Sequence, residues 1–395
     1  MASVVFYFQV HQPFRLRRYT IFDSSSNYFD DRKNEQIVRK VAGKCYLPAT
    51  RIIAELVDRH EGRFRASYSL TGSVIEQFQR WAPEVLELFV RLAKTGCVEF
   101  ISETYYHSLS FLYNRDEFIA QTQMHRRLMQ DLFGQRPRIF RNTELTYNND
   151  VAKVVEDMGF DAILTEGADH ILGYRSPNFI YNPPNCAKLR MLLKNYRLSD
   201  DIAFRFGNRG WSEWPLTAEK FAAWVDLTNG NGYVCNLFMD YETFGEHQWA
   251  DTGIFDFMQA LPEKVMASGK NDFLTVSQGI DRYPAAGEVD VSHMISWADT
   301  ERDISAWLGN SMQANALHDV YALADEVLAT ENEHLIRDWR KLQTSDHFYY
   351  MSTKYFADGD VHKYFNPYQS PYDSYINYMN ILDSIRARLA QHQHA

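Results

Sequence analysis

Short runs of apolar residues recur along the chain, and each run gives way abruptly to polar residues. Most runs are rich in Val, Ile, Phe and Tyr, which is typical of strands buried on both faces. The sequence therefore predicts seven buried strands. They are expected at residues 4–10, 64–70, 97–101, 138–141, 161–165, 189–193 and 233–239.

Segments with the apolar spacing of helices separate these strands. One helix is expected to begin at Gly72 and to be capped by Gly96, because apolar residues recur between them at steps of three and four. Strands that alternate with helices imply a parallel sheet joined by right-handed crossovers, so the pattern predicts an α/β barrel. Residues 14–33 are polar and irregular, and we expect a long loop over the end of the first strand. Further helices are expected from residue 34, after Pro48, and at 115–133, 148–158 and 217–227.

The pattern changes after about residue 285, where strand-like runs give way to helical periodicity at 303–330, 333–342 and 372–389. We expect two domains, a catalytic barrel at residues 1–285 and a helical region at 286–395 packed on it. Between the last two helices, residues 344–365 are aromatic and acid-rich, a composition that no helix requires.

Composition excludes several classes of partner. The 395 residues carry a formal net charge of -10, whereas proteins that hold nucleic acid need a surplus of Lys and Arg. No segment has 18 consecutive apolar residues and no signal segment is evident, so we expect neither a membrane partner nor export, and a cytoplasmic location. The four cysteines are far apart and form no CxxC pair. Nothing in the sequence specifies an oligomeric state.

Acidic residues follow two of the predicted strands, at the end of a barrel where catalytic groups gather. Asp240 stands in LFMDYETFGEH (237–247) and Glu144 in FRNTELTY (140–147), so both would face one cleft. Hydrolysis of a glycosidic bond needs two such carboxyl groups, one protonated and one ionised. The structural alternative is that each acid forms a buried ion pair with an arginine such as Arg141.

A zinc-dependent hydrolase or deacetylase is the main rival interpretation. His11, His107 and His247 also follow predicted strands, and imidazoles together with an acid can bind zinc. However, no HxH, HxxxH or HExxH pair occurs with barrel-strand context. We therefore expect no catalytic metal and no cofactor.

Five stretches together resemble glycoside hydrolase family 57, especially its α-amylase-like members. The resemblance covers nearly the whole chain, and the order of the stretches and their positions at strand ends also match. The five stretches are HQP (11–13), GCVEFISETYYHSL (96–109), FRNTELTY (140–147), MDYETFGEH (239–247) and ISWADTERDISAWLGNSMQ (295–313).

This resemblance implies a distorted (β/α)7 barrel whose helical region contributes to the cleft, and a retaining mechanism on α-glucans without a catalytic metal. Position by position, Glu144 corresponds to the nucleophile and Asp240 to the general acid and base. The remaining matches imply contacts with sugar, including a stacking platform from one of the tryptophans. The implied substrate-binding residues are His11, Glu103, His107, Trp249, Trp297, Asp299 and Trp307.

The sequence departs from the family pattern at Gln9, where many relatives carry a further histidine. This difference leaves the product open. Hydrolysis of α-1,4-glucans, as in α-amylases, is the first expectation, and a 4-α-glucanotransferase or branching enzyme using the same site is the alternative. An inactive carbohydrate-binding protein is disfavoured because Glu144 and Asp240 are both present.

Overall fold

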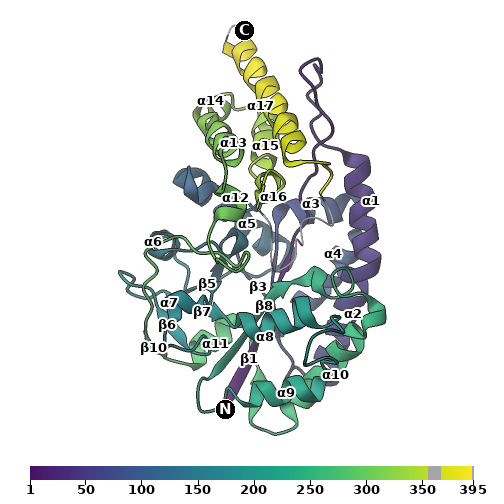
Figure 1. Cartoon of the computed structure of the whole chain (residues 1–395), viewed down its shortest axis with the longest axis vertical. Helices are drawn as coiled ribbons and strands as arrows, with labels where there is room; N and C mark the ends of the chain where they lie inside the picture. Colours follow the sequence, from purple (N-terminus) through teal and green to yellow (C-terminus); the bar gives the residue numbers. More distant parts are fainter. Residues whose placement is uncertain (355–365, 394–395) are drawn as a thin grey trace.

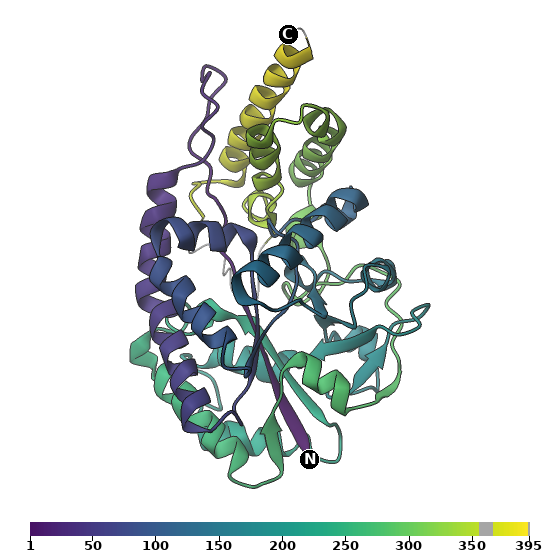
Figure 2. The ribbon, with the colours of Figure 1, turned by 180° about the vertical axis from the view of Figure 1, so that it is seen from behind.

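The computed structural model describes residues 1–354 and 366–393 (Figure 1). A barrel contains the N-terminus, and a group of helices that ends in the long helix α17 (Pro371–Gln393) stands on one end of it (Figures 1 and 2).

Within the described residues, seven parallel strands form the barrel in the order β1-β2-β3-β4-β5-β7-β8, and each predicted strand corresponds to one of them. Two short links complete the circuit. A parallel bridge between Ser102 and Phe140 joins β3 to β4, and the Asn195 amide donates to the Asn236 carbonyl, 2.9 Å away, between β7 and β8. The predicted distorted (β/α)7 barrel is therefore confirmed. Its strands are β1 (Ala2–Val10), β2 (Ala66–Leu70), β3 (Val98–Phe100), β4 (Ile139–Arg141), β5 (Ala162–Glu166), β7 (Arg190–Lys194) and β8 (Val234–Asp240).

Strand β1 shows why the apolar runs are continuous rather than alternating. Val5 and Tyr7 belong to the apolar cluster inside the barrel, whereas Phe6 and Phe8 belong to the cluster between the strands and the outer helices. Both faces are buried, so both alternating sets of side chains are apolar.

Three further strands were not predicted: β6 (Ile180–Asn182), β9 (Asn271–Phe273) and β10 (Ala285–Glu288). β6 runs antiparallel to β7, β10 pairs with β6, and β9 pairs with the first residues of β1. Strands this short carry no recognisable apolar period.

Helices surround the barrel on the outside. The single helix expected from Gly72 to Gly96 is two helices, because Ala82 is non-helical (φ -148°) before Pro83, as the residue preceding a proline tends to be. The helices are α1 (Asp31–Val41), α2 (Leu47–Arg59), α3 (Gly72–Trp81), α4 (Pro83–Ala93), α5 (Arg115–Phe133), α6 (Asn149–Asp157), α7 (Asp169–Leu172), α8 (Tyr196–Asp200), α9 (Ala218–Asp226), α10 (Ile254–Met266) and α11 (Val276–Arg282).

The loop between β1 and α1 projects beside α17 in both views (Figures 1 and 2). Leu16 and Phe29 form an antiparallel bridge at its base, and the Tyr19 amide donates to Asn377 Oδ1 of α17 at 2.6 Å. This segment was expected to lie over the strand end, but instead it extends along the helical region.

A further apolar cluster packs the helical region, including Trp307, Leu317 and Trp339, against Tyr28 and Leu109 from the first part of the chain. Part of the segment 344–365 is helical, and residues 355–365 lie outside the described residues. A domain boundary between residues 285 and 286 stays a prediction. The helices are α12 (Ser305–Leu308), α13 (Ser311–Ala322), α14 (Ala324–Ala329), α15 (Glu333–Lys341), α16 (Ser345–Tyr349) and α17.

In the part of the chain that the structure describes, no helix is both long enough and apolar enough to cross a membrane.

Candidate active site

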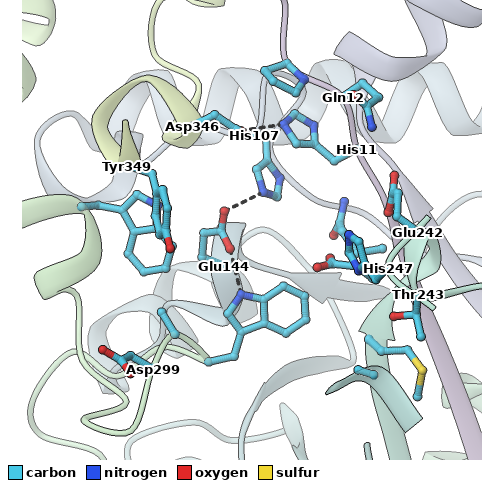
Figure 3. Close-up of a pocket in the computed structure, with 18 of the residues that line it drawn as sticks. His11, Gln12, His107, Glu144, Glu242, Thr243, His247, Asp299, Asp346 and Tyr349 are labelled. Carbon is cyan, nitrogen blue, oxygen red and sulfur yellow. Dashed lines mark hydrogen bonds and ion pairs between the residues drawn. The ribbon is translucent and has the colours of Figure 1, made fainter. Parts of the chain in front are cut away.

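A cavity lies where the carboxyl ends of the barrel strands meet the helical region, with about 1180 Å³ of empty space, part of which is open to solvent (Figure 3). Strand-end residues line it from below, and residues of α12, α16 and the segment before α12 line it from the other side. The lining residues are Gln9, His11, Gln12, Pro13, Arg15, His107, Glu144, Lys194, Ala203, Phe204, Met239, Asp240, Glu242, Thr243, His247, Trp297, Ala298, Asp299, Arg302, Trp307, Asp346 and Tyr349.

Glu144 is positioned by a tight turn after β4. The chain forms a 3₁₀ turn at Thr143–Leu145 with Glu144 and Leu145 both at positive φ (58° and 52°), a conformation that non-glycine residues adopt rarely. Such strained positions gather at functional sites. The Trp297 amide donates to the Glu144 carbonyl at 3.2 Å, which fixes the backbone of the turn from the opposite segment.

Three side chains donate hydrogen bonds to the Glu144 carboxylate, which is only 3% exposed. Trp297 Nε1 donates to Oε2 at 2.8 Å, and Ser345 Oγ donates to Oε1 at 3.0 Å. His107 Nε2 lies 3.3 Å from the same Oε1 (Figure 3). Donors on both oxygens favour the ionised carboxylate and fix its orientation.

His107 joins Glu144 to a second buried acid. Its Nδ1 lies 3.0 Å from Glu103 Oε2. Burial alone would lower the pKa of His107, but the hydrogen bonds and charges of Glu103 and Glu144 raise it to about 9. Burial likewise opposes ionisation of Glu103, but His107 and Arg141 lower the pKa of Glu103 to about 2. At neutral pH, His107 is therefore an imidazolium that donates to both carboxylates.

His11 lies against His107, but His11 is neutral whereas His107 is positively charged. The two rings stack with centroids 4.1 Å apart, and His11 Nε2 is 2.9 Å from Asp346 Oδ2 of α16 (Figure 3). Burial and the nearby charge of His107 lower the pKa of His11 to about 4, although the charge and the hydrogen bond of Asp346 act to raise it. His11 is therefore neutral near pH 7, and both of its ring nitrogens have partners, since Nδ1 lies 3.0 Å from the Thr71 hydroxyl and Nε2 faces Asp346.

The other wall of the cavity carries Asp240 and Glu242. Asp240 ends β8 beside Gln9 of β1, and the next residue, Tyr241, packs outward into the apolar cluster. Glu242 points inward again and accepts a hydrogen bond from the Tyr46 hydroxyl. Burial and the charge of Asp240 raise the pKa of Glu242.

The structure brings most of the predicted site residues together. Glu144, Asp240, His11, His107, Trp297, Asp299 and Trp307 all line the one cavity. Glu103 is fully buried behind His107 rather than on the surface of the cavity.

Trp249 lies apart from the other predicted site residues. It is 55% exposed and is not among the residues lining the cavity, and Lys44 Nζ lies 4.9 Å from the centre of its ring. A contact of Trp249 with sugar stays a prediction. The alternative in which Arg141 pairs with Glu144 is wrong. Among the described residues the Arg141 guanidinium has no hydrogen-bond partner and lies 4.7 Å above the Trp297 ring.

Sequence reasoning missed several lining residues, among them Asp346, Tyr349, Lys194 and Arg302. A signal existed for the first two, because they fall in the acid-rich aromatic segment 344–365. The Arg302 guanidinium donates a hydrogen bond to the Trp297 carbonyl at 2.5 Å. Lys194 Nζ donates to Asp200 Oδ1 at 3.0 Å.

His247 lines the same cavity as His11 and His107. Within residues 1–354 and 366–393, however, no group of three or more His, Cys, Asp or Glu side chains is arranged to hold a metal ion.

Comparisons with known proteins show the family of the chain and agree with its fold. The model of the family described as "Glycosyl hydrolase family 57" matches residues 5–292. A protein of Methanocaldococcus jannaschii named "Putative alpha-amylase" is 44% identical over 393 residues, which is 96% of this chain and 83% of that protein.

Solved structures share the fold at low sequence identity. A 4-alpha-glucanotransferase from Thermococcus litoralis superposes with a TM-score of 0.67 at 14% identity, over 88% of this chain and 56% of that one. A branching enzyme from Pyrococcus horikoshii gives 0.67 at 14% identity, over 100% and 88% of the two chains. An alpha-amylase from Thermotoga maritima gives 0.64 at 12% identity, over 99% and 94%.

Proposed function

Because this chain belongs to glycosyl hydrolase family 57, we propose that it hydrolyses α-1,4-glucans with retention of configuration, using Glu144 as nucleophile and Asp240 as general acid and base. The observation that carries this proposal is that both carboxyl groups line one cavity although they come from strands β4 and β8. The relative named "Putative alpha-amylase", at 44% identity, supports the substrate class.

The environment of Glu144 supports its role as nucleophile. A nucleophilic carboxylate must be ionised and must point its reacting oxygen at the anomeric carbon. Trp297, Ser345 and the imidazolium of His107 donate to this carboxylate and so favour ionisation and a single orientation. The cost of this arrangement is a backbone held at positive φ.

The proposed cycle has two steps. Glu144 attacks the anomeric carbon while Asp240 gives a proton to the departing glycosidic oxygen, so that a glycosyl ester forms and the leaving chain departs as an alcohol. Asp240 then takes a proton from water, which attacks the same carbon and frees Glu144. His11, stacked on His107 and held by Thr71 and Asp346, lines the cavity and would contact the sugar with its ring.

The test is turnover of maltoheptaose and glycogen by wild-type protein and by Glu144→Gln and Asp240→Asn. Each variant should lose about 10³-fold or more of kcat while its far-UV circular dichroism is unchanged. Glu219→Gln, which alters an exposed acid on α9, is the matched control and should keep full activity. Wild-type-like turnover by Glu144→Gln would end the assignment.

Product analysis tests the remaining alternatives. Retention requires the α anomer as the first product in NMR spectra. Short sugars alone indicate hydrolysis, longer α-1,4 chains indicate a 4-α-glucanotransferase, and new branch points indicate a branching enzyme. We expect chelators to leave the rate unchanged, whereas loss of activity that zinc restores would favour a zinc hydrolase.

A further inference from the structure

Arg141 is a buried cation that the proposed cycle does not use. It ends β4, three positions before Glu144, and it is 0% exposed. None of its three guanidinium nitrogens has a hydrogen-bond partner among the described residues. Burial of a charged group without such bonds is costly, so neighbouring groups must compensate for it.

The Trp297 ring and the Glu103 carboxylate both lie near this guanidinium. The centre of the Trp297 ring is 4.7 Å from Arg141 Cζ. Burial raises the pKa of Glu103, whereas His107 and the charge of Arg141 lower it. The two oxygens of Glu103, however, bond to Gln9 and His107. The direct contact of the guanidinium is therefore with the indole ring.

The same ring lies near a second cation. Lys194 ends β7, and its Nζ is 5.4 Å from the centre of the Trp297 ring. This lysine is itself fixed, since Nζ donates to Asp200 Oδ1 at 3.0 Å and lies 3.8 Å from Glu166 Oε2. A buried arginine on one strand and a paired lysine on another thus hold one partly buried ring.

The ring links these cations to the proposed nucleophile. Trp297 Nε1 donates to Glu144 Oε2 at 2.8 Å, and the Trp297 amide donates to the Glu144 carbonyl at 3.2 Å. A cation over an aromatic ring attracts the π electrons of that ring. The indole N–H group then becomes more positive and donates a stronger hydrogen bond, because linked polar interactions polarise one another.

We propose that Arg141 is a positioning residue of the reaction, which fixes the Trp297 ring and strengthens the hydrogen bond from its indole to Glu144. The inference rests on the proposed function. Arg141 is not among the residues that line the cavity, so it acts on the substrate only through other groups. A stronger bond to Glu144 holds the carboxylate in one orientation before it attacks the anomeric carbon.

A route through Glu103 is the alternative. Arg141 helps to keep Glu103 ionised, and Glu103 bonds to His107, which in turn lies 3.3 Å from Glu144 Oε1. That route would not need the N–H group of Trp297, and neither would a purely structural role of Arg141. Trp297→Phe separates these cases, because phenylalanine keeps an aromatic ring but has no N–H group to donate.

The test is a double-mutant cycle on kcat with Arg141→Met and Trp297→Phe. Arg141→Met alone should lower kcat about tenfold and should change KM for maltoheptaose less than about twofold. In the Trp297→Phe background the same change should lower kcat less than about twofold, since no indole hydrogen bond is left to strengthen. A further loss of about tenfold in that background would overturn the inference.

A conservative pair of variants repeats the cycle if Arg141→Met does not fold. Arg141→Lys keeps the charge and Arg141→Gln removes it, so Arg141→Lys should have several times the kcat of Arg141→Gln. This difference should vanish in the Trp297→Phe background, and equal kcat values in the Trp297 background would overturn the inference. Arg126→Met is the matched control, because Arg126 lies 4.4 Å from the centre of the Phe160 ring but does not line the cavity, and it should keep the wild-type kcat.

The NMR resonance of the Trp297 indole proton separates this inference from the proposed function. It is identified as the indole resonance of wild type that is absent from Trp297→Phe. A strong hydrogen bond moves such a proton downfield, so Arg141→Met should move the resonance upfield, whereas Arg126→Met should not. A wild type without glucan activity in which Arg141→Met moves the resonance would refute the proposed function alone. An active wild type in which Arg141→Met leaves it in place would refute the role of Arg141 alone.

Discussion

Trp297 was expected as a possible stacking platform for sugar, but its contacts assign it a second task. Its indole Nε1 donates to Glu144 Oε2 and its backbone amide donates to the Glu144 carbonyl. The Arg141 guanidinium lies 4.7 Å and Lys194 Nζ 5.4 Å from the centre of its ring. A ring held in this way orients the proposed nucleophile.

Trp297→Phe should lower kcat about 10- to 100-fold, because a hydrogen bond to a charged group contributes about 1.5–3 kcal/mol. The ring and its packing are largely kept, so KM should change much less. Trp224→Phe on α9 is the matched control, since that indole packs on Trp211 and Phe221 away from the cavity. Steady-state kinetics check both variants, and an unchanged kcat in Trp297→Phe would contradict the orienting role.

The imidazolium of His107 should make stability depend on pH. Its pKa is raised to about 9 from an ordinary value of about 6.5, so its contribution is fully present below about pH 6.5 and is lost as pH rises through 9. The shift corresponds to about 3 kcal/mol of unfolding free energy. Urea unfolding between pH 6 and 10 should show this decline in wild type.

The control for this decline is His107→Asn, because asparagine tolerates the positive φ of 52° at this position better than most residues. The variant should be less stable at pH 6 and should lack most of the decline toward pH 10. An equal slope in both proteins would assign the decline to other groups.

At the residue scale, the sequence predicted the acids at strand ends but not the side chains that complete their environment. Glu144 and Asp240 stand directly after apolar runs, so their positions could be read from the pattern. Ser345 contacts Glu144 although it is 201 positions away in the chain. No local pattern indicates which residues of a distant helix will close over a cavity. Glu242 stood in a recognised motif, but the pKa of its carboxyl group is raised by burial and by the charge of Asp240, and is lowered by the hydrogen bond from Tyr46, which is 196 positions away.

At the scale of elements, the strands were predicted because each is buried on both faces and is therefore continuously apolar. The break between α3 and α4 was missed because the apolar spacing continues across Pro83, even though the proline itself was visible. Helix α16 was not predicted as a helix, and only the aromatic, acid-rich composition of residues 344–365 set that segment apart. It binds the barrel through its first residue, whose amide donates to the His107 carbonyl at 2.9 Å.

The turn after β8 depends on a glycine. Gly245 has φ of +116°, and a Cβ there would lie 2.0 Å from the Lys44 carbonyl oxygen. Gly245→Ala should therefore destabilise the protein by about 2–4 kcal/mol and should lower kcat, because this turn carries Glu242 and His247. Gly134→Ala is the matched control: Gly134 also has positive φ (+68°) but a Cβ there would meet no atom within 4 Å, so we expect a cost of about 1 kcal/mol. Chemical denaturation measures both, and equal losses would show that backbone conformation alone, not the close approach, sets the cost.

At the scale of the whole molecule, the cavity is built by two parts, the barrel and the helical region. The barrel supplies Glu144, Asp240 and His107, while the helical region supplies Trp307 and the α16 residues. The apolar cluster of the helical region also contains Tyr28 and Leu109, so it joins the two parts. A site assembled in this way keeps its geometry only while the two parts stay docked. The contact of α16 with the His107 loop ties that docking to the proposed nucleophile.

The net charge of -10 leads to a prediction about substrate class. A neutral glucan gains nothing from long-range attraction, so its binding should not respond to screening of the protein's field. KM for maltoheptaose should change less than about twofold between about 0.05 and 0.5 M NaCl, a range over which the Debye length falls about threefold. Heparin, a polyanionic sugar chain, should not inhibit, because the net negative charge of the protein repels it and five acidic residues line the cavity. A KM that rises steeply with salt would instead indicate that the true substrate is charged, and the cations Lys194 and Arg302 in the cavity lining would then be the first residues to test.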